Sequence, residues 1–222
     1  MYIPEHFNEP RLDVLHDLML HNPFGMLVTH TAAGLDANHL PFHLKPGAGT
    51  HGVLQAHVSR ANPVWQALSD GDEVMVVFRA ADAYISPNWY PSKHEAHKQV
   101  PTWNYQVVHA HGTVSLHDDE RYVRALVAQL TRTHEAAQPE PWKMTDAPKD
   151  YISDMLNAIV GVEIAITRLE GKFKLGQNKE ARDIQSAAQG VKASGKPVMG
   201  EAMLSAIGQP LHEPALPAKF PE

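Results

Sequence analysis

The first half of the chain changes from a helical to a strand-like pattern of apolar residues. Apolar side chains recur at helical spacing in residues 9–21, and Pro23 ends the pattern because a residue before proline avoids the helical conformation. Beyond Pro23 the period changes to two, which predicts strands over residues 24–30, 36–44, 52–59 and 104–116. Residues 74–78 are all apolar, so we expect a strand that is buried on both faces.

The second half of the chain adds helices to these strands. Asp118-Asp119 is a typical N-terminal cap, and the residues that follow carry an apolar stripe at helical spacing. They predict a helix that ends near His134. Three prolines in residues 136–150 predict a connector, after which a second helix extends through Ile159 and a strand covers 162–166. Because several strands precede the main helices, the pattern favours a small β-barrel or an α+β fold over a doubly wound sheet.

Composition and charge narrow the possible functions. The 222 residues suggest one or at most two domains, and the absence of cysteine excludes thiolate metal sites and cysteine nucleophiles. A net charge of −6 opposes non-specific attraction to a nucleic-acid backbone. The first residues do not have the pattern of a signal peptide, and residues 155–166 are too short and too polar to span a bilayer. We therefore expect a soluble cytoplasmic protein.

Four segments concentrate aromatic, hydroxyl, amide and cationic side chains. They cover residues 59–63, 84–93, 100–105 and 172–179. A flat heteroaromatic ligand with a phosphate needs stacking surfaces, amides for its polar edge, and a cation with hydroxyls for the phosphate. Walker A and GxGxxG phosphate loops, GxSxG and HExxH are all missing, so no catalytic residue stands out.

Two of these segments also have a structural interpretation. Where a strand ends at Ser59 and a helix begins after Asn62, backbone N–H groups and Arg60 would converge on an anion. The competing interpretation is an ordinary helix cap by Asn62 beside a solvated arginine. The aromatic residues and prolines of 84–93 are equally consistent with the packing of a turn.

Histidines and basic residues raise two further possibilities. Alternation along residues 104–116 places His109 and His111 on one face of a strand, and His94 and His97 are three residues apart. Such pairs are candidate ligands for a metal ion or a haem. Without a thiolate or a carboxylate tied to these pairs, solvated or core histidines are favoured, and we predict no metal. The basic residues of 168–182 are interrupted by glutamates, which favours a solvated face with one or two functional lysines.

The same segments carry a resemblance to a known family. In order along residues 1–190, six motifs resemble those of the PaiB-like FMN-binding negative transcriptional regulators: residues 1–7, 39–42, 57–63, 84–90, 100–105 and 174–178. One position departs from the family pattern, because Gly176 stands where the family usually has a small hydroxyl residue.

The resemblance implies a fold and a cofactor. The expected fold is α+β or mainly β: an FMN-binding split β-barrel with flanking helices, related to the barrels of pyridoxamine-phosphate oxidase and flavin reductase. The protein would form a homodimer with FMN in a cleft between subunits. We expect this domain to cover residues 1–195, and residues 196–222 to form a short helix and a proline-rich tail.

The resemblance also implies which residues bind the cofactor. Ser59 and Arg60 would hold the phosphate beside Asn62. Thr102, Trp103 and Asn104 would lie along the ribityl chain or the ring. Lys174, Gln177 and Asn178 would close the site.

Three functions remain open from the sequence. The first is an FMN-binding transcriptional regulator, with DNA binding implied by the resemblance and opposed by the net charge. The second is an FMN-dependent oxidoreductase that acts on a small substrate with NAD(P)H. The third is a haem-binding split barrel in which His109, His111 or His212 would be the ligand.

Overall fold

The structure, a computed structural model, describes residues 1–208 and divides into two compact units. Unit 1 consists of Met1–Arg11, Arg79–Val107 and the described part of Glu170–Glu222. Unit 2 consists of Leu12–Phe78 and Val108–Leu169. Three long strands contribute residues to both units, and they are β6 (Glu73–Ile85), β7 (Thr102–His117) and β8 (Ile159–Lys174).

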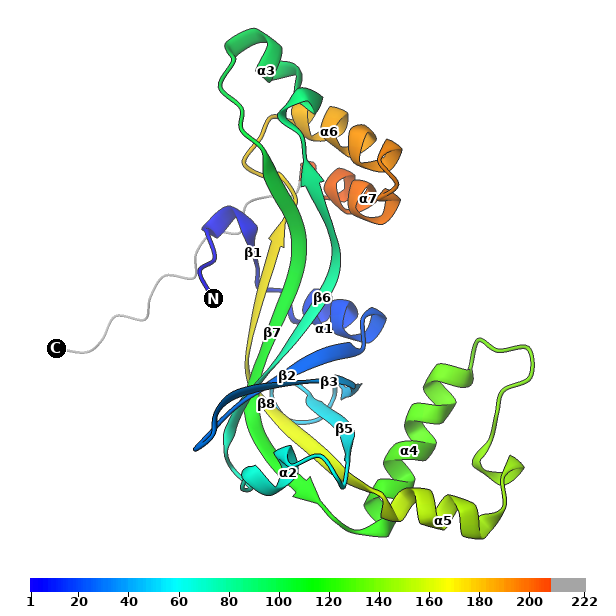
Figure 1. Cartoon of the computed structure of the whole chain (residues 1–222). Coiled ribbons are helices and arrows are strands. Elements are labelled where there is room, and N and C mark those ends of the chain that lie inside the picture. Colours follow the sequence, from blue (N-terminus) through cyan, green and yellow to red (C-terminus); the bar gives the residue numbers. More distant parts are fainter. Residues whose placement is uncertain (209–222) are drawn as a thin grey trace, which may run out of the picture. The chain divides into compact units, whose positions relative to one another are not determined.

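The strands form one eight-stranded sheet in the order β3-β2-β6-β7-β8-β5-β4, with β1 paired to β8 (Figure 1). The shorter strands are β1 (Asn8–Glu9), β2 (Phe24–Thr31), β3 (Gly34–Pro41), β4 (His43–Lys45) and β5 (Val53–Ser59). The pairing is antiparallel between β2 and its neighbours β3 and β6, and between β5 and its neighbours β4 and β8. Every second residue from Leu54 to Val58 and from Val160 to Ile166 is buried, as expected where one face of a sheet covers a core, and Gln55 and Gly161 are buried as well.

The helices of unit 2 are amphipathic. They are α1 (Leu12–His21), α2 (Val64–Ala67), α4 (Glu120–Glu135) and α5 (Lys149–Asn157), with a 3-10 turn η3 (Met144–Asp146). The Asp119 carboxylate accepts a hydrogen bond from the Tyr122 N–H at 2.8 Å and so begins α4. Val123 on α4 packs with Ile152 and Leu156 on α5, which joins the two helices through a small apolar cluster.

A polar cluster fixes α4 to the sheet within unit 2. The Gln55 amide donates to the Tyr122 hydroxyl at 2.8 Å and to the Glu163 carboxylate at 2.7 Å, and the Tyr122 hydroxyl also donates to Glu163 at 3.0 Å. The His117 ring stacks on Tyr122 with centroids 3.7 Å apart. A Cβ at Gly161 would lie 2.8 Å from the Tyr122 ring, so a glycine is required for this approach.

Unit 1 contains three helices in its described residues. They are α3 (Pro91–Ala96), α6 (Ala181–Ala193) and α7 (Pro197–Ser205), with 3-10 turns η1 (Glu5–Phe7) and η2 (Pro87–Trp89). Helices α6 and α7 pack together. The Trp89 ring approaches Gly190 so closely that a Cβ there would lie 2.5 Å from the indole. In the described part of the chain, no helix has the length and apolar character needed to cross a membrane.

Several predicted elements differ from the observed ones. The strand predicted at 74–78 continues to Ile85. The expected burial on both faces is wrong, because Val74, Val76 and Phe78 are buried whereas Met75 and Val77, on the other face, are half-buried. The strand predicted at 36–44 is divided at Phe42, whose N–H donates to Pro23 O. Ile159 begins β8 and does not belong to the preceding helix, because α5 ends at Asn157.

The C-terminal part of the chain contains elements that the apolar pattern of the sequence did not predict. The segment predicted as basic and polar begins as the end of β8, which reaches Lys174. Helix α6 was not predicted, because its buried positions include small residues such as Ala187 and Ala188, which give a weak apolar period. Part of the predicted tail, with His212, falls on 209–222 and lies outside the described residues. The domain boundary at residue 195 stays a prediction.

The polar cluster under α4 predicts a stability effect. Replacing Tyr122 by phenylalanine should lower the free energy of unfolding by about 1–3 kcal/mol, because Gln55 and Glu163 then lose a buried partner. Urea denaturation measures the change. Tyr151→Phe serves as the control because Tyr151 is 54% exposed, and it should leave the midpoint unchanged. Equal midpoints for the two variants would show that the hydroxyl contributes no net stability.

Candidate functional site

The residues that the sequence nominated are divided between the two units. Unit 2 holds Ser59, Arg60 and Asn62. Unit 1 holds Thr102, Trp103, Asn104, Lys174, Gln177 and Asn178. Each group therefore forms its own candidate site.

In unit 1, the start of β7 and the end of β8 bring Lys174 to Thr102 and Trp103. The Lys174 ammonium donates to the Thr102 hydroxyl and, at 2.8 Å, to the main-chain carbonyl of Trp103. It also lies over the Phe7 ring, 6.0 Å from the centroid. Burial, together with the positive charges of Lys172 and Lys179, lowers the pKa of Lys174 below its usual range. The cation is thus held in place without a carboxylate beside it in the described contacts.

Asn104 lies next along this face of β7 and is 1% exposed. Its side-chain nitrogen has no hydrogen-bond partner among the described residues. A Cβ at Gly176 would lie 3.8 Å from that nitrogen, and Gly176 has a φ of +97°, a conformation that favours glycine. A small hydroxyl residue at this position would be within reach of the amide, whereas glycine leaves it unpaired. A buried N–H group without an acceptor is costly, so Asn104 is suited to donate to a ligand.

Trp103 points to the opposite face of β7, since side chains alternate along a strand. Its indole is 55% exposed and meets Tyr84 edge to face, with centroids 6.0 Å apart. Beside it, Tyr105 and the ion pair of Arg79 with Asp82, at 2.7 Å, line a hollow of about 310 Å³. The structure therefore separates the predicted stacking residue from the polar side chains of Thr102 and Asn104.

Gln177 holds its own loop. Its carbonyl oxygen accepts from the Leu175 N–H at 2.8 Å, and its amide nitrogen donates to Phe173 O at 2.6 Å. Asn178 lines a different hollow with Gln99 and Lys179. Both polar atoms of Gln177 are thus engaged within the chain, and its predicted contact with a cofactor stays a prediction, as does that of Asn178.

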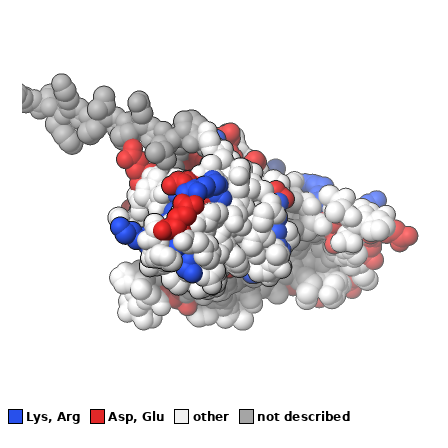
Figure 2. Space-filling view, turned by 90° about the horizontal axis from the view of Figure 1, so that it is seen from above, with Lys and Arg blue, Asp and Glu red and all other residues white. Residues whose placement is uncertain are grey.

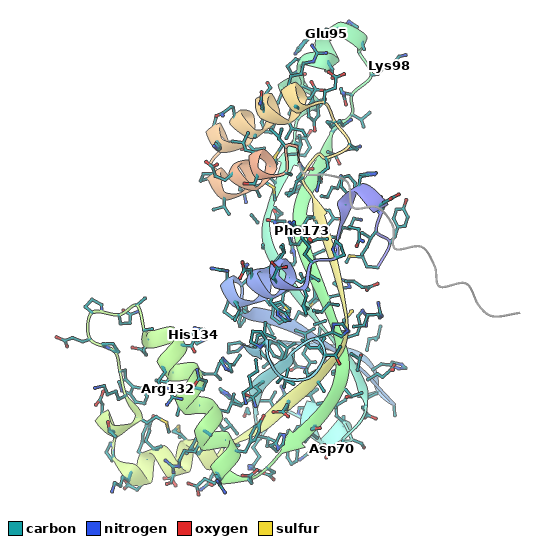
Figure 3. All side chains as sticks on the ribbon, turned by 180° about the vertical axis from the view of Figure 1, so that it is seen from behind. Asp70, Glu95, Lys98, Arg132, His134 and Phe173 are labelled. Carbon is teal, nitrogen blue, oxygen red and sulfur yellow. The ribbon has the colours of Figure 1, made fainter. Side chains whose placement is uncertain are left out.

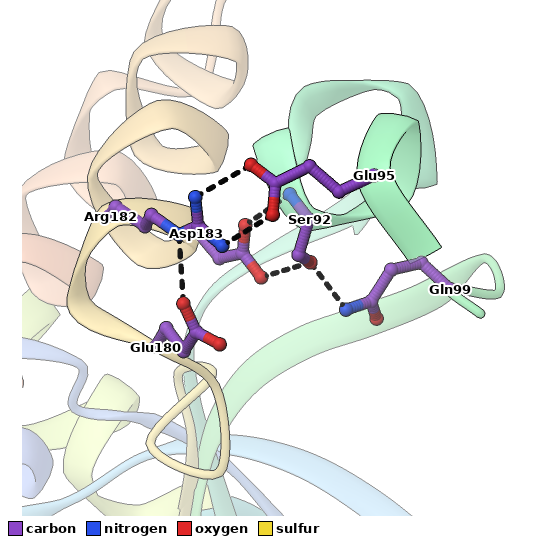
Figure 4. A network of polar contacts seen from close by, with 6 residues as sticks. All are labelled: Ser92, Glu95, Gln99, Glu180, Arg182 and Asp183. Atoms are coloured by element: carbon purple, nitrogen blue, oxygen red, sulfur yellow. Dashed lines mark hydrogen bonds and ion pairs between the residues drawn. The ribbon is translucent and has the colours of Figure 1, made fainter. Parts of the chain in front are cut away.

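Asp183, on α6, was not predicted from the sequence, yet it organises the tip of unit 1 (Figure 4). It is 1% exposed and accepts from the Ser92 N–H at 3.0 Å and from the Ser92 hydroxyl at 2.5 Å. Gln99 donates to the same hydroxyl at 2.8 Å. Burial, and then the charge of Asp183, raises the pKa of Tyr90. These contacts support the interpretation of residues 84–93 as a packed turn.

The basic residues near α6 are paired with carboxylates. Arg182 forms ion pairs with Glu95 at 2.7 Å and with Glu180 at 2.8 Å. On the face seen in Figure 2, acidic and basic side chains lie next to one another and no extended basic patch is visible. This arrangement supports the interpretation of residues 168–182 as a solvated face.

In unit 2, the Arg60 guanidinium is bound to a carboxylate and to main-chain carbonyls. It donates to both oxygens of Asp118, at 2.9 and 2.5 Å, and to Asn157 O at 2.7 Å. The hydrogen bonds from Arg60 lower the pKa of the Asp118 carboxyl. Asp118 had no assigned partner in the sequence, where it was taken with Asp119 as a helix cap. An anion at Arg60 would have to share the guanidinium with this carboxylate or displace it.

Asn62 and Ser59 are also used locally. The Asn62 side-chain oxygen accepts from the Val64 N–H at 3.0 Å, and its nitrogen donates to Asn38 at 2.7 Å. The Ser59 hydroxyl accepts from the Ala61 N–H at 3.3 Å. Asn62 thus supports the start of α2 from the position before its N-cap Pro63, whereas Arg60 is paired with Asp118 and not simply solvated. The phosphate role of Ser59, Arg60 and Asn62 stays a prediction.

Two pairs of histidines in unit 2 differ in their surroundings. His109 and His111 lie on one face of β7, with ring centroids 6.4 Å apart, as their spacing predicts. His57 and His117 were not singled out from the sequence. Each has a buried ring nitrogen without a hydrogen-bond partner among the described residues, and burial lowers the pKa of His57.

Comparison with solved structures shows the fold. The chain is similar to the FAD and heme binding protein from Mycobacterium smegmatis, with 18% sequence identity, a TM-score of 0.52, and coverage of 80% of this chain and 78% of that one. A likeness at this level of identity speaks for the fold alone. It confirms the predicted split β-barrel with flanking helices.

Comparison of sequences shows the family. The chain is 28% identical over 189 residues to "Protease synthase and sporulation protein PAI 2" of Bacillus subtilis, covering 85% of this chain and 88% of the relative. It is 29% identical over 230 residues to an uncharacterized protein of Emericella nidulans, covering 88% and 92%. Residues 1–168 match the family described as "Putative FMN-binding domain". The chain therefore belongs to this FMN-binding domain family, and FMN is its cofactor.

Proposed function

We propose that this protein binds FMN with Thr102, Asn104 and Lys174 as donors to the cofactor. The observation that carries this proposal is the buried amide nitrogen of Asn104, which has no acceptor among the described residues. The oxygen and nitrogen atoms of a flavin ring, and the hydroxyls of its ribityl chain, are acceptors for such a group. The Thr102 hydroxyl shares a face of β7 with Asn104, and the Lys174 ammonium reaches it from β8, so the donor set fits the cofactor.

Trp103 would serve the cofactor from the other face of β7. Its half-exposed indole offers a stacking surface, but a ring stacked there would not reach the Asn104 side chain on the opposite face. In the homodimer that the resemblance implies, the two faces of β7 would contribute to different copies of the site. We therefore propose a cytoplasmic homodimer in which Trp103 contributes a stacking surface.

Unit 2 offers its own candidate phosphate site, in which Arg60 would hold the phosphate of FMN with Ser59 and Asn62 beside it. Arg60 presents a fork of donors, which suits an oxyanion, and Asp118 already shows that a carboxylate fits it. The contacts of Asn62 to Val64 and Asn38 fix the bend that carries this arginine. In this proposal the phosphate takes the place of Asp118 at the guanidinium.

A regulatory role follows as the proposed use of FMN. When bound, FMN supplies one- and two-electron transfer, while the chain supplies binding groups and their electrostatic environment. The family resemblance supports negative transcriptional regulation. The net charge of −6 and the pairing of Arg182 with carboxylates favour an indirect route over direct contact with DNA. Gel-shift assays with and without FMN test this point, and tight binding to operator DNA would contradict the indirect route.

An FMN-dependent oxidoreductase is the second candidate. It is favoured by the hollow beside Trp103, where Tyr105 and Arg79 offer an aromatic face and a cation to a small substrate. NAD(P)H oxidation by the FMN-loaded protein distinguishes this candidate from a regulator without turnover. A Soret band after haem addition would instead favour the haem-binding alternative.

The unpaired amide of Asn104 yields a first prediction. Asn104→Leu should weaken FMN binding by roughly tenfold while leaving the stability of the FMN-free protein unchanged or higher, because a buried unsatisfied donor is replaced by an apolar group. Flavin fluorescence titration and urea denaturation measure the two effects. Gln138→Leu, at an exposed position, is the control and should alter neither. Unchanged FMN affinity in Asn104→Leu would remove Asn104 from the site.

Lys174 yields a pH dependence. Its ammonium stabilises bound FMN only while protonated, and its pKa is lowered, so FMN affinity should fall as the pH rises through that lowered pKa. Fluorescence titrations between neutral and alkaline pH follow this decrease. Lys174→Met should bind more weakly at neutral pH and flatten the profile, whereas Lys192→Met, which removes a lysine paired with Glu201, should keep it. A wild-type profile in Lys174→Met would exclude the assigned role.

The paired state of Arg60 yields a third prediction. Arg60→Ala should weaken FMN binding by roughly ten- to a hundredfold, because hydrogen bonds between charged groups are lost. It should not affect riboflavin, which has no phosphate. Asp118→Asn should have the opposite effect and strengthen FMN binding, because it frees the guanidinium from its carboxylate. FMN binding that survives Arg60→Ala would refute the phosphate role.

A further inference from the structure

A second hollow lies within unit 2, between one face of α4 and the strands β4 and β5. Its volume is about 310 Å³. The helix contributes positions 122, 125, 126, 129 and 132, which share one face at helical spacing. The sheet contributes His43 and Lys45 from β4, together with Gln55, which pairs with His43 across the strands. None of these residues belongs to the FMN site proposed above.

The lining of this hollow, which we call the α4 hollow, is basic. His43, Lys45 and Arg132 line it, and none of its described lining residues is acidic, although the whole chain carries a net charge of −6. Arg132 and His134 lie in the last turns of α4 (Figure 3). Burial, and then the charges of Lys45 and His134, lower the pKa of His43. The nearby positive charges thus add to the effect of burial on His43.

The charges of the α4 hollow are not paired within it. In the described part of the chain, the Lys45 side chain makes no hydrogen bond or ion pair, and the Arg132 side chain makes one hydrogen bond, to Gln129 at 2.7 Å. A favourable interaction with the negative end of the helix dipole accounts for Arg132 and His134. It does not account for His43 and Lys45, because these residues come from β4.

The floor of the α4 hollow is fixed and polar. Gln55 is 4% exposed, and its amide nitrogen is held by Tyr122 and Glu163. Burial, followed by the hydrogen bond to Glu163, raises the pKa of Tyr122, so the phenol stays neutral. The Glu163 carboxylate accepts from both residues and does not line the hollow. Ala125 and Leu126 supply an apolar wall.

We propose that the α4 hollow binds a small organic anion, whose oxyanion group is held by His43, Lys45 and Arg132 while its apolar part lies against Leu126. Two cations, Lys45 and Arg132, together with the His43 imidazole, which can donate an N–H or take up a proton, suit a carboxylate or a phosphate monoester. The α4 hollow shares no lining residue with the groups assigned to FMN, so it would be a second ligand site of the protein.

Isothermal titration of the FMN-loaded protein tests the proposal, with citrate, glycerol 3-phosphate and inorganic phosphate as probes at constant ionic strength. We expect saturable binding of at least one probe, and the probe that binds distinguishes a carboxylate from a phosphate ligand. Arg132→Gln and Lys45→Gln should each weaken binding by at least about tenfold, as expected for the loss of a charge-assisted hydrogen bond. Absence of saturable binding by all three probes would overturn the proposal.

Arg121→Gln is the matched control, because Arg121 is an exposed arginine on α4 that does not line the hollow. It should change the affinity by less than about twofold. An equal loss in Arg121→Gln and Arg132→Gln would mean a general charge effect and would reject the site. Thermal melts of each variant verify folding, which substitutions at the exposed Lys45 and Arg132 should preserve.

NMR titration of His43 gives a second measurement. A bound anion favours the protonated imidazole, so the pKa of His43 should rise on addition of the probe that binds. An unchanged pKa would contradict contact with His43. Displacement of the probe by excess FMN would show that FMN occupies the hollow and would overturn its assignment as a second site. Failure of FMN binding alone, with saturable anion binding retained, would affect only the function proposed above.

Discussion

The interior position of β7 in the sheet is the constraint on which the candidate site depends. A strand with neighbours on both edges uses most of its backbone groups in the sheet, so its side chains supply most of its other contacts, although the Trp103 carbonyl also accepts from Lys174. These side chains alternate, and Asn104 is buried while the adjacent Trp103 is exposed. A single strand thus presents a polar donor on one face and an aromatic surface on the other. Any ligand site built on β7 has to use these faces separately.

Local patterns predicted much of this architecture from the sequence. The period of two identified β2, β5 and β7, and the Asp119 cap with its apolar stripe identified α4. The long extension of β6 was missed because Arg79 and Asp82 interrupt its apolar run. Patterns within a few residues are informative where the chain buries one regular face, and less so where small or charged residues occupy the element.

The candidate site was less predictable because its contacts join distant parts of the sequence. The nominated residue types were suitable for FMN, but the partner of Arg60 is Asp118, and that of Ser92 is Asp183, 91 residues further along. No local sequence pattern distinguishes an arginine that is available to bind a phosphate from one that is paired with a carboxylate. Nor does the local sequence show that both polar atoms of the Gln177 side chain form hydrogen bonds within its own loop.

The contact of Gly161 with Tyr122 has a consequence for how the sequence can change. The space filled by the tyrosine ring exists only while position 161 has no side chain. Substitutions at the two positions are therefore coupled. Tyr122 has to be replaced by a smaller residue before a Cβ at position 161 can avoid the clash with its ring. The order of permitted changes is fixed by this close approach, even though the two residues belong to different elements and lie 39 positions apart in the sequence.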